Sequence, residues 1–415
     1  MPTAVLVGTL DTKGREYAFV RDMLLDNGLD VITVDVGVLG RPGFHPDIGA
    51  DLVCQAAGHT LASLQFGREG SDTRAVALNV MRDGATVIVQ QLTEQGRCDG
   101  VMGLGGSGGS AVLSGAMRSL PFGLPKLLVS TMASGDVSAY VGSSDLCLMH
   151  SVTDIAGLNR ISRLVLANAA AAMAGMIAGR TAAQYEDARP VDARPAVGVT
   201  MLGVTTPGAL RVIKRLEAAG YEPIVFHAVG SGGRAMESLI SSGVITGVVD
   251  FTIKEVTDAL LGGAFDAGPD RLRSAGRLGY PQVVVPGAME VLNFGPLSSV
   301  PAGLRDGSRP LVQHNDQVTA VRISDAEAER VAGEVAERLN QSTGPVSVVV
   351  PSRGLDSYDT VDGPFFDPEA DALMIRSLET GLRGDIEIVT SDTHINDPAF
   401  ADLVADTFIR LARST

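Results

Sequence analysis

Residues 101–109 read VMGLGGSGG, an apolar run that ends in glycines, and a helix-like run from Ser110 to Met117 follows. The four letters Gly-Ser-Gly-Gly at 106–109 return at 230–233, again after a strand-like run and before a helix-like one. A strand that breaks into glycines before a helix leaves backbone N–H groups unpaired at the positive end of the helix dipole. The repeated pattern therefore predicts two anion sites, with a nucleotide or phosphorylated ligand held between two similar domains.

Each half of the chain also opens with the same order of elements. The first half has a strand at 4–7, a loop, a helix at 15–27 and a strand at 30–36. The second half has a strand at 197–202, a loop, a helix at 209–219 and a strand at 222–229. Apolar β-rich runs that alternate with amphipathic segments are typical of parallel α/β structure.

We therefore expect an α/β protein with two doubly wound, mainly parallel-sheet domains and a ligand cleft between them. The domains are predicted at residues 1–185 and 195–415, because the segment 180–194 is polar and contains proline. Later helices are predicted at 327–340 and 368–381. The last predicted helix, 397–412, could pack on either domain.

The composition indicates a globular protein, with 45% hydrophobic and 20% charged residues. A net charge of −15 and an aromatic content of 4% argue against nucleic acid as a partner. The alanine-rich stretch 164–177 carries Asn168 and is expected to be a buried helix, not a membrane span. No signal peptide is recognisable and the three cysteines are scattered, so we expect a cytoplasmic location.

The loop after the first strand reads Gly8-Thr9-Leu10-Asp11-Thr12-Lys13-Gly14. It falls at the carboxyl end of the strand, where open α/β sheets bind ligands. Thr9 and Thr12 offer hydroxyls, Lys13 offers a charge for phosphate, and Asp11 offers a carboxylate for a metal or a ribose. The glycine spacing is not that of a Walker A loop. An ordinary turn, in which Asp11 or Thr12 caps the helix, accounts equally well for these residues.

The loop at 103–109 formally contains G-x-G-x-x-G. In a dinucleotide-binding fold this motif occupies the first βα turn, and an acidic residue follows about 20 residues later. Here the motif comes late in the domain, and the next strand ends at Ser130-Thr131-Met132-Ala133-Ser134 without an acid. We therefore disfavour NAD and interpret the loop as a phosphate cradle. The candidate ligand contacts are Gly105, Gly106, Ser107, Gly108 and Gly109, with the hydroxyls of Ser130, Thr131 and Ser134 nearby. The alternative is a tight turn with close helix–sheet packing.

Polar clusters in the second half lie at 250–255, 290–293, 314–316 and 352–354, each close to an apolar run. Loops after parallel strands converge on one edge of a sheet, so these groups could share a cleft. The second domain would supply the other wall of the ligand site through Gly230, Gly232, Gly233, His314 and Asn315. Paired carboxylates there could hold Mg²⁺, which prefers oxygen ligands. The alternative is that most of these residues are helix caps and surface turns.

Several ungapped segments, taken together and in order, resemble one family. They are 7–13, 103–109, 125–134, 226–233, 286–288, 351–354 and 362–371. With them the chain resembles the ATP-binding family that is named after the N-terminal half of the tomato mosaic virus resistance protein. The resemblance covers nearly the whole chain. It implies two α/β domains, ATP binding largely by the first domain, and self-association, for which we expect a homodimer.

The sequence thus leads us to expect a cytoplasmic ATP-binding protein, with Asp11, Asp136 and Glu290 as candidate metal carboxylates. ATP turnover on a small-molecule substrate is left open by these residues. One alternative is an isomerase or carbon–carbon lyase whose glycine loops bind a phosphorylated or carboxylated metabolite. Another is a nucleotide-gated binding module without catalysis. Neither nucleic acid nor a membrane is an expected partner.

Overall fold

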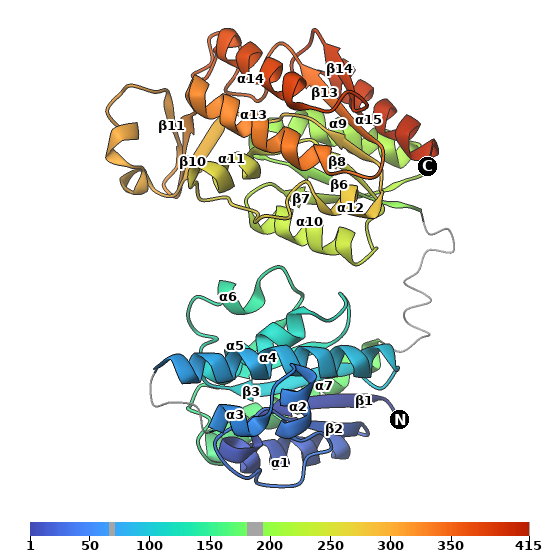
Figure 1. The fold of residues 1–415 in the computed structure, drawn as a ribbon, viewed down its shortest axis with the longest axis vertical. Helices are drawn as coiled ribbons and strands as arrows, with labels where there is room; N and C mark the ends of the chain where they lie inside the picture. The colour runs from blue at the N-terminus through green and yellow to red at the C-terminus, as the bar shows by residue number, and fades with distance from the viewer. Residues whose placement is uncertain (66–70, 181–193, 415) are drawn as a thin grey trace. The chain divides into compact units, whose positions relative to one another are not determined.

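A computed structural model describes residues 1–65, 71–180 and 194–414 (Figure 1). The chain divides into two compact units, Met1–Val191 and Asp192–Thr415. Each unit is built on its own sheet with alternating helices, which confirms the predicted pair of mainly parallel α/β domains. The predicted boundary segment, apart from its end residues Arg180 and Arg194, lies outside the described residues. The ligand cleft between the domains stays a prediction.

The first domain has a five-stranded parallel sheet in the order β2-β1-β3-β4-β5. Its strands are β1 (Thr3–Gly8), β2 (Asp30–Asp35), β3 (Gly100–Gly105), β4 (Lys126–Ser130) and β5 (Cys147–His150). Its helices are α1 (Leu10–Asp26), α2 (Ala50–Ala56), α3 (Leu61–Gln65), α4 (Ser71–Glu94), α5 (Ser107–Arg118), α6 (Ser138–Val141) and α7 (Arg160–Gly179). The strand order reverses between β1 and β3.

Both faces of this sheet are covered, because successive strand side chains point to opposite faces. Ala4 and Leu6 of β1 join the core that α1 and α7 complete. Val5 and Val7 join the opposite core, which is shared with α2, α4 and α5. The carboxyl ends of the strands are left free for loops, and this is the edge where a ligand site is expected.

Helix α7 contains the alanine-rich stretch of the sequence. One face is buried against α1 and the sheet through Leu166, Ala170 and Met173, while Ile161 and Leu164 are exposed. Among the residues that the structure describes, α7 is the one helix long and apolar enough to cross a membrane. A core helix passes the same test of length and composition, and the packing of α7 is that of a core helix on one face.

The second domain has a six-stranded parallel sheet in the order β14-β13-β9-β8-β6-β7. Its strands are β6 (Ala196–Met201), β7 (Glu222–His227), β8 (Gly247–Asp250), β9 (Gln282–Val284), β13 (Val346–Pro351) and β14 (Glu387–Ser391). Its α-helices are α9 (Thr206–Ala218), α10 (Ser231–Ser241), α11 (Lys254–Leu261), α12 (Ser274–Leu278), α13 (Asp325–Asn340), α14 (Pro368–Gly381) and α15 (Pro398–Arg413). Short 3-10 turns lie at Gly203–Thr205 (η1), Leu297–Ser299 (η2) and Ala302–Leu304 (η3). Helix α15 packs on α9 and on this domain's own sheet.

A small antiparallel sheet stands beside the main sheet of the second domain (Figure 1). It consists of β10 (Val291–Phe294), β12 (Val318–Arg322) and β11 (Leu311–Asn315). The expectation that residues 314–316 follow a parallel strand is therefore wrong. The run at 311–315 forms a hairpin with β12, and the short turn at 316–317 allows only an antiparallel return.

Candidate functional site

A cavity of about 1260 Å³ opens in the first domain where β1 and β3 end. Both predicted loops line it, although they are far apart in the sequence. The contributing site residues are Thr9, Asp11, Thr12, Lys13, Gly106, Ser107, Gly108 and Gly109. The loops meet because the strand order reverses between β1 and β3, which leaves a crevice at the carboxyl edge of the sheet.

The amino end of α5 opens into this cavity. Its N-cap, Gly106, has extended backbone and provides no side-chain cap. The N–H groups of Ser107, Gly108 and Gly109 have no hydrogen-bond partner within the described part of the chain. The first turn of a helix leaves such groups free and carries the positive end of the dipole, so this end of α5 is suited to an anion.

The starts of α1 and α10 are already occupied by carboxylates of the chain. Asp35, at the end of β2, accepts the N–H of Leu10 at the start of α1, at 3.0 Å. Glu255 Oε1 accepts the N–H groups of Gly230 and Gly233 at the start of α10, at 2.6 and 3.1 Å. Burial raises the pKa of Asp35, and its hydrogen bonds from backbone N–H groups oppose that rise.

The second glycine loop is therefore a closed turn, as in the alternative in which such residues form caps and turns and do not bind a ligand. A Cβ atom on Gly232 would lie 2.0 Å from the carbonyl oxygen of His227, so only glycine fits there. Gly230 has a positive φ of 85°. The structure thus corrects the assignment of Gly230, Gly232 and Gly233 as ligand contacts, because Glu255 fills the turn that they form.

The charged groups that line the first-domain cavity are mainly positive. Among the described lining residues, three side chains are cationic, Lys13, Arg41 and Arg74, and one is a carboxylate, Asp11. The Lys13 ammonium group donates to the carbonyl oxygen of Ile155. Asp11 accepts the N–H of Leu39 through Oδ2 at 2.7 Å. Its Oδ1 atom is buried and has no partner among the described residues, so it can accept a hydrogen bond from a ligand.

Four of the contacts predicted in the first domain do not line this cavity. The Ser130 hydroxyl lies 2.6 Å from that of Ser110 and accepts the N–H of Met132, so it fastens β4 to α5. A Cβ on Gly105 would lie 2.7 Å from the nitrogen of Ser110, which makes this glycine a packing residue. Thr131 and Ser134 follow β4 and are also absent from the cavity lining.

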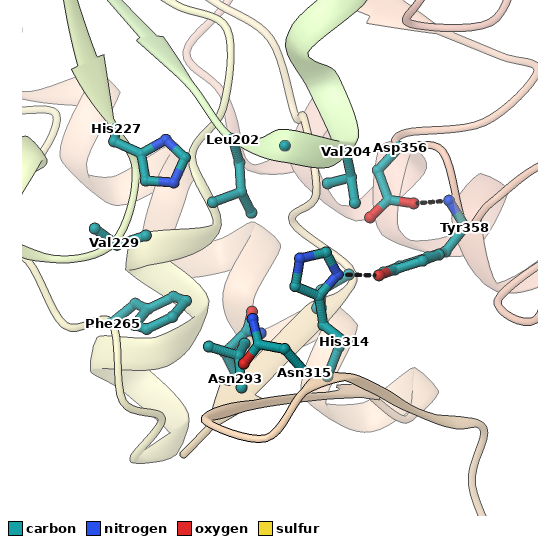
Figure 2. Close-up of a pocket in the computed structure, with 14 residues that line it drawn as sticks. Leu202, Val204, His227, Val229, Phe265, Asn293, His314, Asn315, Asp356 and Tyr358 are labelled. Carbon is teal, nitrogen blue, oxygen red and sulfur yellow. Dashed lines mark hydrogen bonds between the residues drawn. The ribbon is translucent and has the colours of Figure 1, made fainter. Parts of the chain in front are cut away.

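His314 and Asn315 lie at a different pocket, of about 320 Å³, in the second domain (Figure 2). Its polar lining groups come from the ends of parallel strands and from the antiparallel sheet. They are His227, Asn293, His314, Asn315, Asp356 and Tyr358. His314 Nδ1 lies 2.7 Å from the Tyr358 hydroxyl, and Asp356 Oδ1 accepts the N–H of Tyr358 at 2.7 Å.

Three other buried carboxyl groups, those of Glu290, Asp359 and Asp371, lie close to Asp356. Burial, more than any neighbouring charge, raises the pKa of Asp356 to about 7 and that of Asp371 to about 8. Burial followed by the charges of Asp356 and Asp359 raises the pKa of Glu290 well above its usual range. Arg322 pairs with Asp371 at 2.6 Å.

Within the described ranges no group of three or more His, Cys, Asp or Glu side chains is arranged to hold a metal ion. The Asp356 and Asp359 side chains were missed by the sequence analysis. Their signal is weak, a pair of aspartates three residues apart in the loop that follows β13. Asp136, another candidate metal carboxylate of the sequence, accepts the N–H of Ser138 at 2.9 Å.

Comparison with known proteins places both halves of the chain in one group of sequences. Models of the uncharacterised protein family UPF0261 match residues 2–182 (N-terminal domain) and 194–412 (C-terminal domain). A UPF0261 protein of Clostridium tetani is 39% identical over 408 residues, 98% of each chain. One of Mesorhizobium japonicum is 40% identical over 416 residues, the full length of both. The ToMV resistance protein Tm-1(GCR237) of Solanum lycopersicum is 36% identical over an alignment of 427 positions, gaps included, which covers 99% of this chain and 56% of the tomato protein.

Proposed function

We propose that this chain, which belongs to the uncharacterised protein family UPF0261, binds ATP with its first domain. The site is the cavity between the loops that follow β1 and β3. The resemblance to the tomato protein's N-terminal half supplies the expectation of ATP. The main support for the proposal is that two segments with the same sequence, Gly-Ser-Gly-Gly, have different surroundings. The α10 start holds a carboxylate of its own chain, whereas the α5 start opens on a cavity lined by three cations.

The donor set fits a polyphosphate. Free N–H groups on Ser107, Gly108 and Gly109 suit phosphate oxygens, as in other glycine-rich helix starts. Lys13, Arg41 and Arg74 add positive charge, and hydrogen bonds to charged groups are about twice as strong as neutral ones. The cavity exceeds the volume of about 300–1,000 Å³ that small-molecule pockets commonly have, so a whole nucleotide has room.

The remaining polar groups of the first loop fit the rest of a nucleotide. The unpartnered Oδ1 atom of Asp11 would accept a hydrogen bond from a ribose hydroxyl or from a water of a phosphate-bound Mg²⁺ ion. Thr9 and Thr12 lie beside it, with their hydroxyl oxygens 3.1 Å apart. When Mg²⁺ is bound to the nucleotide it would neutralise phosphate charge.

Calorimetry on the full chain tests the proposal. We expect ATP to bind more tightly than AMP, and adenosine to bind weakest, because the N–H groups and the cations act on phosphate. Inorganic tripolyphosphate should compete with ATP. Equal affinity for ATP and adenosine, or no binding of ATP with or without Mg²⁺, would contradict it. Release of ADP in the same mixtures separates an ATP-dependent enzyme from a nucleotide-gated binding module.

A further inference from the structure

The pocket of the second domain differs chemically from the cavity of the first. Its lining is largely apolar, with Leu202, Val229 and Phe265 among the contributors. Among the described residues, the polar groups that line it are two imidazoles, two amides, a phenol and one carboxylate, without a lysine or an arginine. A phosphate or a carboxylate would lack a fixed cation here. The volume of about 320 Å³ is at the lower end of the range for small-molecule pockets. The pocket therefore fits a small uncharged compound with hydroxyl or carbonyl groups.

One wall of the pocket places a proton acceptor beside a hydrogen-bond pair (Figure 2). Asp356 Oδ1 is held by the N–H groups of Tyr358 and Asp359, at 2.7 and 3.1 Å. Its Oδ2 atom is buried and has no partner among the described residues. The Tyr358 hydroxyl meets His314 Nδ1 at 2.7 Å. The backbone thus fixes one oxygen of the carboxyl group and leaves the other available to a ligand.

The groups around Asp356 keep it able to change protonation state. Asp359, Glu290 and Asp371 share the interior with the guanidinium group of Arg322. The buried ammonium group of Lys254, which pairs with Asp258, also acts on Glu290. Both carboxyl oxygens of Glu290 and the Oδ1 atom of Asp359 have no hydrogen-bond partner among the described residues. On the opposite side, His394 Nε2 lies 2.8 Å from the backbone carbonyl oxygen of Asp356.

Four buried carboxyl groups around one guanidinium cannot all be ionised at low cost, so some of them hold protons near neutral pH. The pKa of Asp356, near 7, gives both the acid and the base form at neutral pH, which suits a general acid–base group.

We infer that this pocket binds a small uncharged hydroxy-carbonyl compound, and that Asp356 Oδ2 exchanges a proton with the carbon next to its carbonyl group. The carboxylate takes the proton, and the C–H electron pair forms the double bond of an enolate. The carbonyl oxygen takes up the negative charge and accepts a hydrogen bond from the His314–Tyr358 pair. Return of a proton from the carboxyl group restores the compound. This site lies in the second domain and is independent of the ATP proposal.

Proton NMR in D₂O tests the inference with the full chain and three neutral probes, namely dihydroxyacetone, D-erythrulose and D-xylulose. We expect at least one probe to gain deuterium beside its carbonyl faster than in protein-free solution. Dihydroxyacetone phosphate should not, because the described residues that line the pocket include no lysine or arginine. No exchange above the protein-free rate with any of the three, or faster exchange with the phosphate, overturns the inference.

Variants of Asp356 and Tyr358, compared with a control, test whether these side chains take part in the proton transfer. Asp356→Asn should lower the exchange rate about a hundredfold or more. Asp362→Asn is the control, because Asp362 is an exposed aspartate of the same loop whose φ of 67° asparagine tolerates. If circular dichroism shows that Asp356→Asn does not fold, Tyr358→Phe provides the test, since it keeps the ring and removes only the hydroxyl. We expect it to lower the rate about a hundredfold with little change in KM. Wild-type exchange in both aspartate variants, or in Tyr358→Phe, refutes the role of this wall.

Discussion

The carboxylate oxygen Oε1 of Glu255 lies 2.6 Å from the backbone nitrogen of Gly230. This hydrogen bond gives one of two identical glycine loops a structural role. The other carboxylate oxygen, Oε2, accepts the Nε–H of the buried Arg271 at 2.7 Å. The α10 start is therefore neutralised from inside the domain. The α5 start opens on the cavity, and no carboxylate of the described residues accepts its first N–H groups.

Gly108→Val should weaken ATP binding without harming the fold. A Cβ at Gly108 meets only side-chain atoms, the nearest at 3.5 Å, so valine fits but occupies space beside the free N–H groups. We expect a loss of about tenfold or more in affinity by calorimetry. Gly333→Val is the control, because Gly333 is an exposed helical glycine of the second domain whose added Cβ meets nothing within 4 Å. Equal losses in both variants would show that the effect is not local.

Lys13→Ala should also weaken ATP binding. Loss of a charge-assisted hydrogen bond costs about 1.5–3 kcal/mol, or roughly ten- to a hundredfold in affinity. The loss should be larger for ATP than for AMP, since the lysine acts on phosphate charge. Lys214→Ala, at an exposed position on α9, controls for the change in net charge. Unchanged ATP affinity in Lys13→Ala would remove the first loop from the site.

Glu255→Gln should destabilise the second domain and leave ATP binding unchanged. The substitution leaves Arg271, which is fully buried, short of one counter-charge, although Asp250 remains 2.6 Å away. Breaking a buried ion pair commonly costs about 3–5 kcal/mol. Chemical denaturation followed by circular dichroism measures the loss, with Glu217→Gln on the exposed side of α9 as the control. A gain of ATP affinity in Glu255→Gln would instead indicate that the α10 turn can bind phosphate.

The stability of the second domain should fall as the pH rises. Asp356 has a folded-state pKa of about 7, above the value of about 3.9 that an unfolded aspartate has. Between these values the folded state binds more protons than the unfolded state, so its stabilisation is complete below about pH 4 and is lost towards pH 7. Between these two pKa values, one such group lowers the free energy of unfolding by about 1.4 kcal/mol for each pH unit.

Denaturation of wild type and Asp356→Asn across this pH range isolates that contribution. The difference between the two free energies of unfolding should change with pH, while the difference between wild type and Asp362→Asn should stay flat. A flat difference for Asp356→Asn as well would mean that this carboxyl group titrates normally.

A homodimer is the assembly that we predict, and light scattering at micromolar concentration tests it. Ala171 is exposed on α7, so Ala171→Glu should fold. Dissociation of the variant into folded monomers would place this face of α7 at the interface. A dimer that persists in Ala171→Glu would place the interface elsewhere, and a monomeric wild type would reject the dimer itself.

The candidate site could be predicted only in part. The β1 loop and residues 106–109 were identified from glycines and hydroxyls after strands, and they do line one cavity. Ser130 was assigned on the same grounds, but its hydroxyl is used by Ser110. Asp356 carries only a weak local signal, the nearby Asp359, because its role depends on Glu290 and Asp371, which distant segments bring close to it. Burial, and not residue type, gives these acids their properties.

The sequence by itself determined the alternation of strands and helices and the two parallel sheets, because hydrophobic periodicity and glycine breaks act over a few residues. It could not distinguish the two Gly-Ser-Gly-Gly segments, since their local chemistry is the same. Only the tertiary structure decided that Glu255, from the segment after β8, reaches the start of α10, while no carboxylate in the described part of the chain bonds the start of α5. The physical reason is that a helix start attracts any anion within hydrogen-bonding distance, and which anion is near depends on how distant segments pack.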